Sequence, residues 1–114
     1  MELTIDQALQ KAVEAHKAGK LQDAENLYRA ILQAQPNHPD ANHKLGVMAV
    51  SLNEAEATLP LFKTAIKANP NQGQFWLSCI DALIKEKKFD NARTLLEQGK
   101  KRGLAGEKVE AVET

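Results

Sequence analysis

The chain has 114 residues, 43% of them hydrophobic and 26% charged, and its 15 basic and 15 acidic side chains give a formal net charge of zero. This balance argues against nucleic acid or an anionic membrane surface as the main partner, because both need a dense basic face. No apolar run approaches the ~20 residues that span a bilayer, and the start, MELTIDQALQ, has neither a signal-peptide nor a transit-peptide pattern. With Cys79 as the one cysteine, these features predict a cytoplasmic protein in a reducing compartment.

Residues that start and stop helices can be recognised from the beginning of the chain onward. A first helix is predicted over residues 5–18, because Thr4 begins a capping-box pattern, T-x-x-Q, and Gly19 breaks the run. A second helix is predicted over residues 21–34. It stops ahead of Pro36, since proline disfavours helical geometry in the residue before it.

The third helix is predicted to begin at Pro39, where a missing N–H costs nothing, and to end before Asn53. Pro60 is harder to place, because proline in a helix interior costs ~3 kcal/mol. It is expected in the first turn of a fourth helix that starts near residues 55–57 and runs to Ala68. Three further helices are predicted at residues 73–86, 89–101 and 105–113.

The chain repeats itself at a fixed spacing of 34 residues. The stretch AENLYRAILQAQPNHP (24–39) superposes without a gap on TLPLFKTAIKANPNQG (58–73), and ARTLLEQGKKRGLAGE (92–107) continues in the same register. The matched pairs include Leu27 with Leu61, Tyr28 with Phe62, and Pro36 with Pro70. The sequence is therefore built from three similar helix–turn–helix units.

A 34-residue helical hairpin with small residues at fixed places and a closing proline resembles the tetratricopeptide repeat (TPR). In this family the eighth position is small or apolar, and here it holds Ala12, Gly46 and Ile80. The twentieth position is usually alanine and holds Ala24, Thr58 and Ala92. The twenty-fourth position is aromatic in the family and holds Tyr28, Phe62 and Leu96. The resemblance implies an all-α, right-handed superhelix in one domain, residues 1–114. Its three hairpins would lie at about 5–38, 39–72 and 73–106, with a short capping helix at about 105–113.

Ligands of this family are usually contacted from positions 2, 5, 9, 12 and 13 of each repeat, on the concave face. The resemblance thus implies a partner-binding groove formed by Leu9, Val13, His16, Lys17, His43, Val47, Val50, Leu77, Asp81, Ile84 and Lys85. Positions 5, 9 and 12 hold aliphatic residues at six of nine places, a stripe expected to be polar if it only faced water. An apolar groove with charged edges suits an amphipathic helix or an extended apolar segment. Self-association and packing within the molecule remain alternative uses of the stripe.

Chaperone-tail binding is not expected. TPR proteins that grip the terminal carboxylate of chaperones carry Lys, Asn and Arg at positions 5 and 9, whereas this chain has Leu9, Val13, His43, Val47, Leu77 and Asp81 there. A metal site is not expected either, because no Cys or Glu cluster joins His16 and His43. Cys79 lacks an activating His or Lys beside it and is predicted to be a buried thiol.

The sequence contains no P-loop, nucleophile-elbow or zinc-protease pattern. We therefore expect no catalysis and no cofactor, but a protein–protein interaction module. Two alternatives remain. The segment also resembles the repeat region of bacterial TPR proteins that precedes a transferase domain, such as a glycosyltransferase, which implies a regulatory or acceptor-binding role. Alternatively, the chain is a self-assembling scaffold in which one molecule fills the groove of the next.

Overall fold

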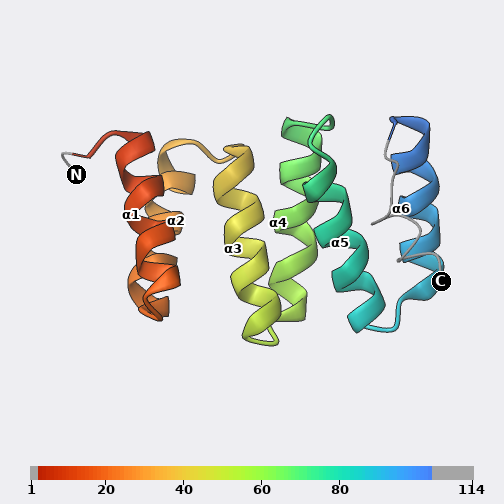
Figure 1. Cartoon of the computed structure of the whole chain (residues 1–114), viewed down its shortest axis with the longest axis horizontal. Coiled ribbons are helices and arrows are strands. Elements are labelled where there is room, and N and C mark those ends of the chain that lie inside the picture. The colour runs from red at the N-terminus through yellow and green to blue at the C-terminus, as the bar shows by residue number, and fades with distance from the viewer. Residues whose placement is uncertain (1–2, 104–114) are drawn as a thin grey trace.

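A computed structural model describes residues 3–103, without the side chains of residues 55 and 56. Its helices lie side by side in a row (Figure 1), and the structure measures 44 × 25 × 23 Å. In chain order they are α1 (Ile5–Lys17), α2 (Leu21–Ala34), α3 (Pro39–Ser51), α4 (Ala55–Ala68), α5 (Gly73–Lys85) and α6 (Phe89–Lys101). The six predicted helices are confirmed to within two residues. The predicted capping helix lies outside the described residues.

Side-chain caps fix the starts of two helices. At α1 the predicted capping box is present: Thr4 Oγ1 accepts the Gln7 N–H at 3.1 Å, and Gln7 Oε1 accepts the Thr4 N–H at 2.9 Å. At α3, His38 Nδ1 accepts the Ala41 N–H at 3.1 Å, immediately before Pro39. These bonds satisfy donors that the first turn of a helix leaves free, so both starts are set locally.

The turn inside each hairpin has the same backbone shape. Its middle residue adopts a left-handed conformation, with φ of 79° at Gly19, 58° at Asn53 and 60° at Lys87. Glycine and asparagine tolerate this region, whereas lysine is strained there. One backbone hydrogen bond of 2.8 Å recurs in all three turns, from Lys20 N to Ala15 O, Glu54 N to Ala49 O and Lys88 N to Leu83 O. The 34-residue repeat of the sequence is thus a repeat of backbone geometry.

The expectation that Pro60 lies in a first turn is wrong, although the predicted start of its helix is correct. α4 begins at Ala55, so Pro60 is its sixth residue and lies inside the helix. A proline there has no N–H to donate to the carbonyl of residue 56. The helix continues regardless, because Phe62 and Ala65, two and five residues after the proline, are fully buried and their burial offsets the lost bond.

The loops between hairpins share a hydrogen bond made by different residues. Trp76 Nε1 donates to the Pro70 carbonyl at 2.9 Å, and Asn42 Nδ2 donates to the Pro36 carbonyl at 3.0 Å. Asn42 stands 34 residues before Trp76 and is also buried. Trp76 is a packing residue, since it is 5% exposed. In the second repeat, the amide of Asn42 makes the hydrogen bond that the indole of Trp76 makes in the third.

Buried side chains form two clusters along the row. The first is built on α1, α2 and α3 from Ala8, Ala12, Ala24, Tyr28, Ile31, Ala41, Leu45 and Met48. The second is built on α4, α5 and α6 from Phe62, Cys79, Ile80, Ala82, Leu83, Ala92 and Leu96. Leu61 of α4 packs against the first cluster and Val50 of α3 against the second, so the two clusters interlock. The described residues thus form an all-α row of three helical hairpins.

Candidate functional site

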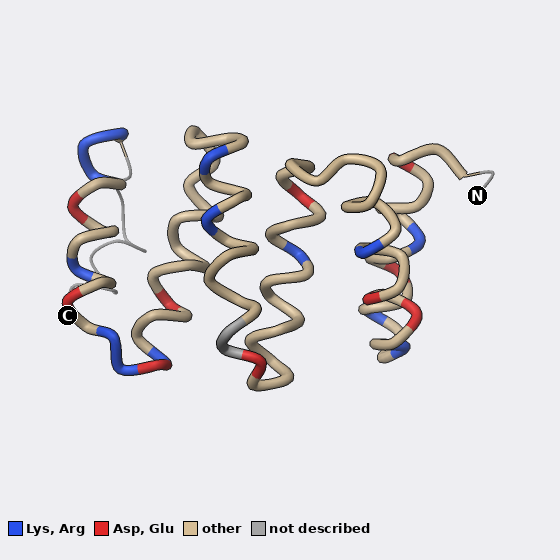
Figure 2. Tube along the Cα trace, turned by 180° about the vertical axis from the view of Figure 1, so that it is seen from behind, with Lys and Arg blue, Asp and Glu red and all other residues tan. Residues whose placement is uncertain are grey.

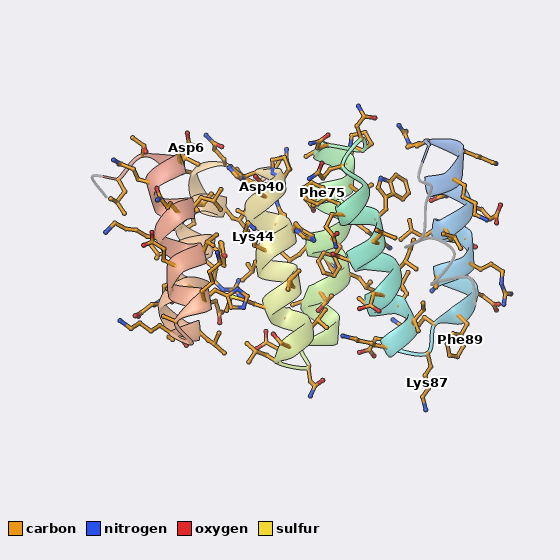
Figure 3. All side chains as sticks on the ribbon, viewed as in Figure 1. Asp6, Asp40, Lys44, Phe75, Lys87 and Phe89 are labelled. Atoms are coloured by element: carbon orange, nitrogen blue, oxygen red, sulfur yellow. The ribbon has the colours of Figure 1, made fainter. Side chains whose placement is uncertain are left out.

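All eleven residues of the predicted groove lie on α1, α3 and α5, the first helices of the three hairpins. We call the surface that they form the A-helix face. Figure 3 shows Asp6 and Asp40 near the beginnings of α1 and α3, and Lys87 and Phe89 at the opposite edge of the molecule. The predicted face therefore has two distinct edges, set by the two ends of its helices.

Four of the six aliphatic residues on this face already have apolar neighbours within the molecule. Leu9 packs against the first core cluster. The second cluster takes the other three, Val50, Leu77 and Ile84. Each of them is half-buried, so part of its surface still faces outward. Packing within the molecule accounts for much of the stripe without any partner.

Val13 and Val47 differ from these four. Neither is among the side chains that pack against the clusters, and they occupy the same repeat position, 34 residues apart. Val13 is half-buried, whereas Val47, in the second half of α3, is 38% exposed. Val47 is therefore the most exposed of the six aliphatic residues; Leu52 and Phe89, which lie outside the predicted set, are 41% and 54% exposed.

His43 joins α3 to α5 on this face. Its Nε2 lies 2.7 Å from Ser78 Oγ. Its ring centroid is 4.8 Å from that of Phe75 and 5.7 Å from that of Phe62, both buried. Burial lowers the pKa of His43 below its ordinary value of 6.5, and the nearby Lys44 acts in the same direction. The position of the ring between two repeats therefore favours its neutral form.

The charged residues of the predicted set are Lys17 on α1 and Asp81 and Lys85 on α5. Lys85 Nζ is 3.6 Å from Asp81 Oδ2, but both side chains are more than half exposed, so the pair contributes little to stability. His16 is half-buried and Lys17 exposed at the end of α1. Figure 2 shows basic and acidic residues interspersed along the row rather than gathered by sign. The face can thus orient a partner by charge but has no single-sign field.

Several hollows lie among the described residues. One of about 90 Å³ lies between the α3–α4 turn and the end of α5 and includes two predicted residues, Val50 and Lys85. One of about 240 Å³ is lined by Trp76, Gly99 and Arg102, among others. A shallow one of about 580 Å³ lies on α1 and α2. Within residues 3–103 there is no group of three His, Cys, Asp or Glu side chains that could hold a metal ion.

The sequence did not reveal how His43 is held. Its partners, Ser78, Phe75 and Phe62, stand at positions that the groove pattern does not include. The available signal was the residue itself: the equivalent positions hold Leu9 and Leu77, so a polar ring there required a polar partner. Cys79 is buried as predicted, and burial raises its pKa to about 11. Such a thiol is not a nucleophile near neutral pH.

Family comparison identifies the fold. Two family models described as tetratricopeptide repeat match this sequence, one over residues 9–70 and one over residues 49–105. The chain belongs to the tetratricopeptide repeat family. Solenoids of this kind present extended surfaces that bind proteins or peptides. Among the described residues, no helix is long and apolar enough to cross a membrane.

Solved structures give the same fold. MamA AMB-1 matches with a TM-score of 0.82 and 21% identity, over 96% of this chain and 60% of that chain. A Thermobaculum terrenum O-GlcNAc transferase mutant matches with a TM-score of 0.77 and 20% identity, over 87% of this chain and 19% of that chain. The chain thus spans less than two thirds of either protein, and at these identities the likeness shows the fold alone. Comparison with curated proteins finds no match.

Proposed function

We propose that this chain is a non-catalytic TPR module that binds a helical or extended apolar segment of another protein across the A-helix face, with residues 1–114 as one domain. Family membership supports an interaction role. The observation that carries the choice of surface is Val47, a 38% exposed aliphatic residue on the central first helix. It lies in line with Val13 of the preceding repeat.

The binding mechanism follows from the rigidity of the row. Packed helices hold the apolar side chains in place before binding, so most of the ordering cost falls on the partner segment. Val13, Val47 and Ile84 supply apolar contact area, as in other helix-in-groove complexes. The charged residues of the face, Lys17, Asp81 and Lys85, set the orientation of the segment more than its affinity.

The experiment compares capture of proteins from a lysate by three immobilised chains: wild type, Val47→Glu and Leu52→Glu. Leu52, 41% exposed, follows α3 outside the predicted set, so Leu52→Glu adds the same charge at a similarly exposed aliphatic position. A carboxylate inside an apolar contact should weaken binding at least about tenfold. We expect Val47→Glu alone to lose the captured partner while its helix content, measured by circular dichroism, stays unchanged. Equal capture by all three chains would refute the proposal.

Two further roles remain as alternatives. A self-assembling scaffold would use the same face for a second copy, so its mass by light scattering would rise above 12.5 kDa as concentration increases a hundredfold. The other alternative is a regulatory or acceptor-binding segment of a transferase; an O-GlcNAc transferase contains a stretch of the same fold. That role predicts that the captured protein is a transferase or its acceptor. A constant mass and an unrelated partner would leave the interaction module as the function.

A further inference from the structure

One hydrogen bond links the second and third repeats across the A-helix face. His43 of α3 and Ser78 of α5 are 35 residues apart in sequence, and their side chains meet at 2.7 Å. The histidine ring also lies against Phe75 of α5 and Phe62 of α4. The first and third repeats carry Leu9 and Leu77 at this position, and both leucines pack against a core cluster. A titratable ring therefore replaces an aliphatic packing residue in the central repeat alone.

The direction of this bond depends on the tautomer of His43, and a neighbouring hydrogen bond favours one of the two directions. Gln74 Nε2 donates to Ser78 Oγ at 3.2 Å. A hydroxyl that accepts one hydrogen bond becomes a better donor in the next, so we assign the Ser78 hydroxyl as the donor to His43 Nε2. A ring nitrogen that accepts carries no proton, so the imidazole must be neutral with its proton on Nδ1. Proton binding at Nε2 removes this acceptor, so the Ser78 hydroxyl must then turn and accept from a charged ring that has lost part of its water.

The surroundings of the ring favour the same neutral state. Burial and Lys44 both lower the pKa of His43, while Asp40 raises it by a smaller amount. The groups that α4 and α5 place against the ring are Phe62, Phe75 and Ser78, none of which carries a charge. An imidazolium there has lost water and gained no anionic partner from the neighbouring helices.

We propose that His43 and Ser78 form a pH-sensitive latch, which holds the second and third repeats together on the A-helix face while His43 is neutral and releases them when it binds a proton. The folded state disfavours the proton relative to the unfolded chain, where histidine titrates near 6.5. The unfolded chain therefore binds more protons in slightly acidic solution. The stabilisation is fully present above about pH 6.5 and is lost as the pH falls through the lower value of the folded state.

The first test is a titration of the three histidine rings by nuclear magnetic resonance, in the wild type and in Ser78→Ala. The resonances of His16 and His38 serve as references in the same spectra. In the wild type His43 should show the Nδ1–H tautomer. The Ser78→Ala variant should raise the pKa of His43, because the donor that favours its neutral form is gone. An unchanged or lowered pKa in this variant would overturn the proposal, since it would mean that the serine accepts rather than donates.

The second test follows urea unfolding of the full chain at about pH 7.5 and pH 5.0, the lower value lying above the ordinary carboxyl pKa of about 4. Fluorescence of Trp76 in α5 reports the third repeat, and circular dichroism reports all helices. For the wild type we expect the two transitions to coincide at pH 7.5. At pH 5.0 the fluorescence midpoint should fall about 0.5 M urea below the dichroism midpoint, as expected when one polar contact between repeats is weakened.

His43→Leu is the matched variant, since the other two repeats carry leucine at this position. In this variant the two transitions should coincide at both pH values. The same separation at pH 5.0 as in the wild type would refute the latch, and so would coincident wild-type transitions at pH 5.0. The latch concerns the repeats themselves and its test needs no partner. Its failure would leave the proposed function standing, and failure of the proposed function would leave the latch.

Discussion

Gly46 is the position where a single added carbon tests the packing between α3 and α4 most sharply. A Cβ on this residue would lie 2.5 Å from Phe62 Cε1 and 2.7 Å from Cδ1. Phe62 is 1% exposed within the second core cluster, so its ring has little room to retreat. Replacing Gly46 by alanine therefore forces a fully buried aromatic ring to shift by most of an ångström.

The size of the effect follows from two opposing contributions. Overpacking a core costs about 1–3 kcal/mol, and this displacement belongs in the upper half of that range. Alanine gains about 1 kcal/mol over glycine in a helix interior. Gly46→Ala should therefore destabilise the chain by about 1–2 kcal/mol, which lowers Tm by roughly 4–16 °C for a domain of about 100 residues.

The assay is thermal unfolding by circular dichroism, with Phe62→Leu as the partner variant. Leucine stands at the equivalent place of the third repeat, as Leu96. Because leucine removes the ring edge that meets the new Cβ, Gly46→Ala should cost less in the Phe62→Leu background, with a coupling energy above about 1 kcal/mol. A neutral or stabilising Gly46→Ala in the wild-type background would refute the reasoning, since helix propensity would then outweigh the contact.

Two further predictions concern strain and thiol burial. Lys87→Gly should stabilise the chain by about 0.5–1 kcal/mol, because φ of 60° strains a lysine but not a glycine. Lys87→Ala keeps the strain and should leave the midpoint of urea unfolding unchanged. A gain of stability in both variants would contradict this account. Cys79, with a pKa raised to about 11, should react with a thiol reagent near pH 8 only as fast as α5 opens. Immediate labelling of the folded chain would show that the thiol is not buried as described.

The helix bounds could be predicted because their causes are local. Thr4, Gly19 and Pro39 act on neighbours within a turn, and the 34-residue period aligned one hairpin with the next. The local penalty of a proline predicts the wrong position for Pro60, because Phe62, two residues further on, is fully buried inside the same helix. A buried aromatic ring can offset a missing backbone hydrogen bond, and this burial is a tertiary property.

The candidate site was predicted less completely, because it depends on contacts between repeats. The sequence shows which residues lie on the first helices of the hairpins. It does not show that Leu9 and Leu77 pack against core clusters while Val47 stays exposed. The bond between His43 and Ser78 joins residues 35 positions apart, beyond the reach of any local rule. Asn42 similarly makes the loop hydrogen bond that Trp76 makes one repeat later, although the two side chains are chemically unlike.

The most direct test of the central claim is a map of amide and methyl chemical-shift changes when the captured partner segment is added to the labelled chain. The account predicts that the largest changes lie on α1, α3 and α5, around Val13 and Val47, with α2 and α4 largely unaffected. Changes centred on α2, α4 or α6 instead would contradict it, because the partner would then bind a face other than the one formed by the first helices of the three hairpins.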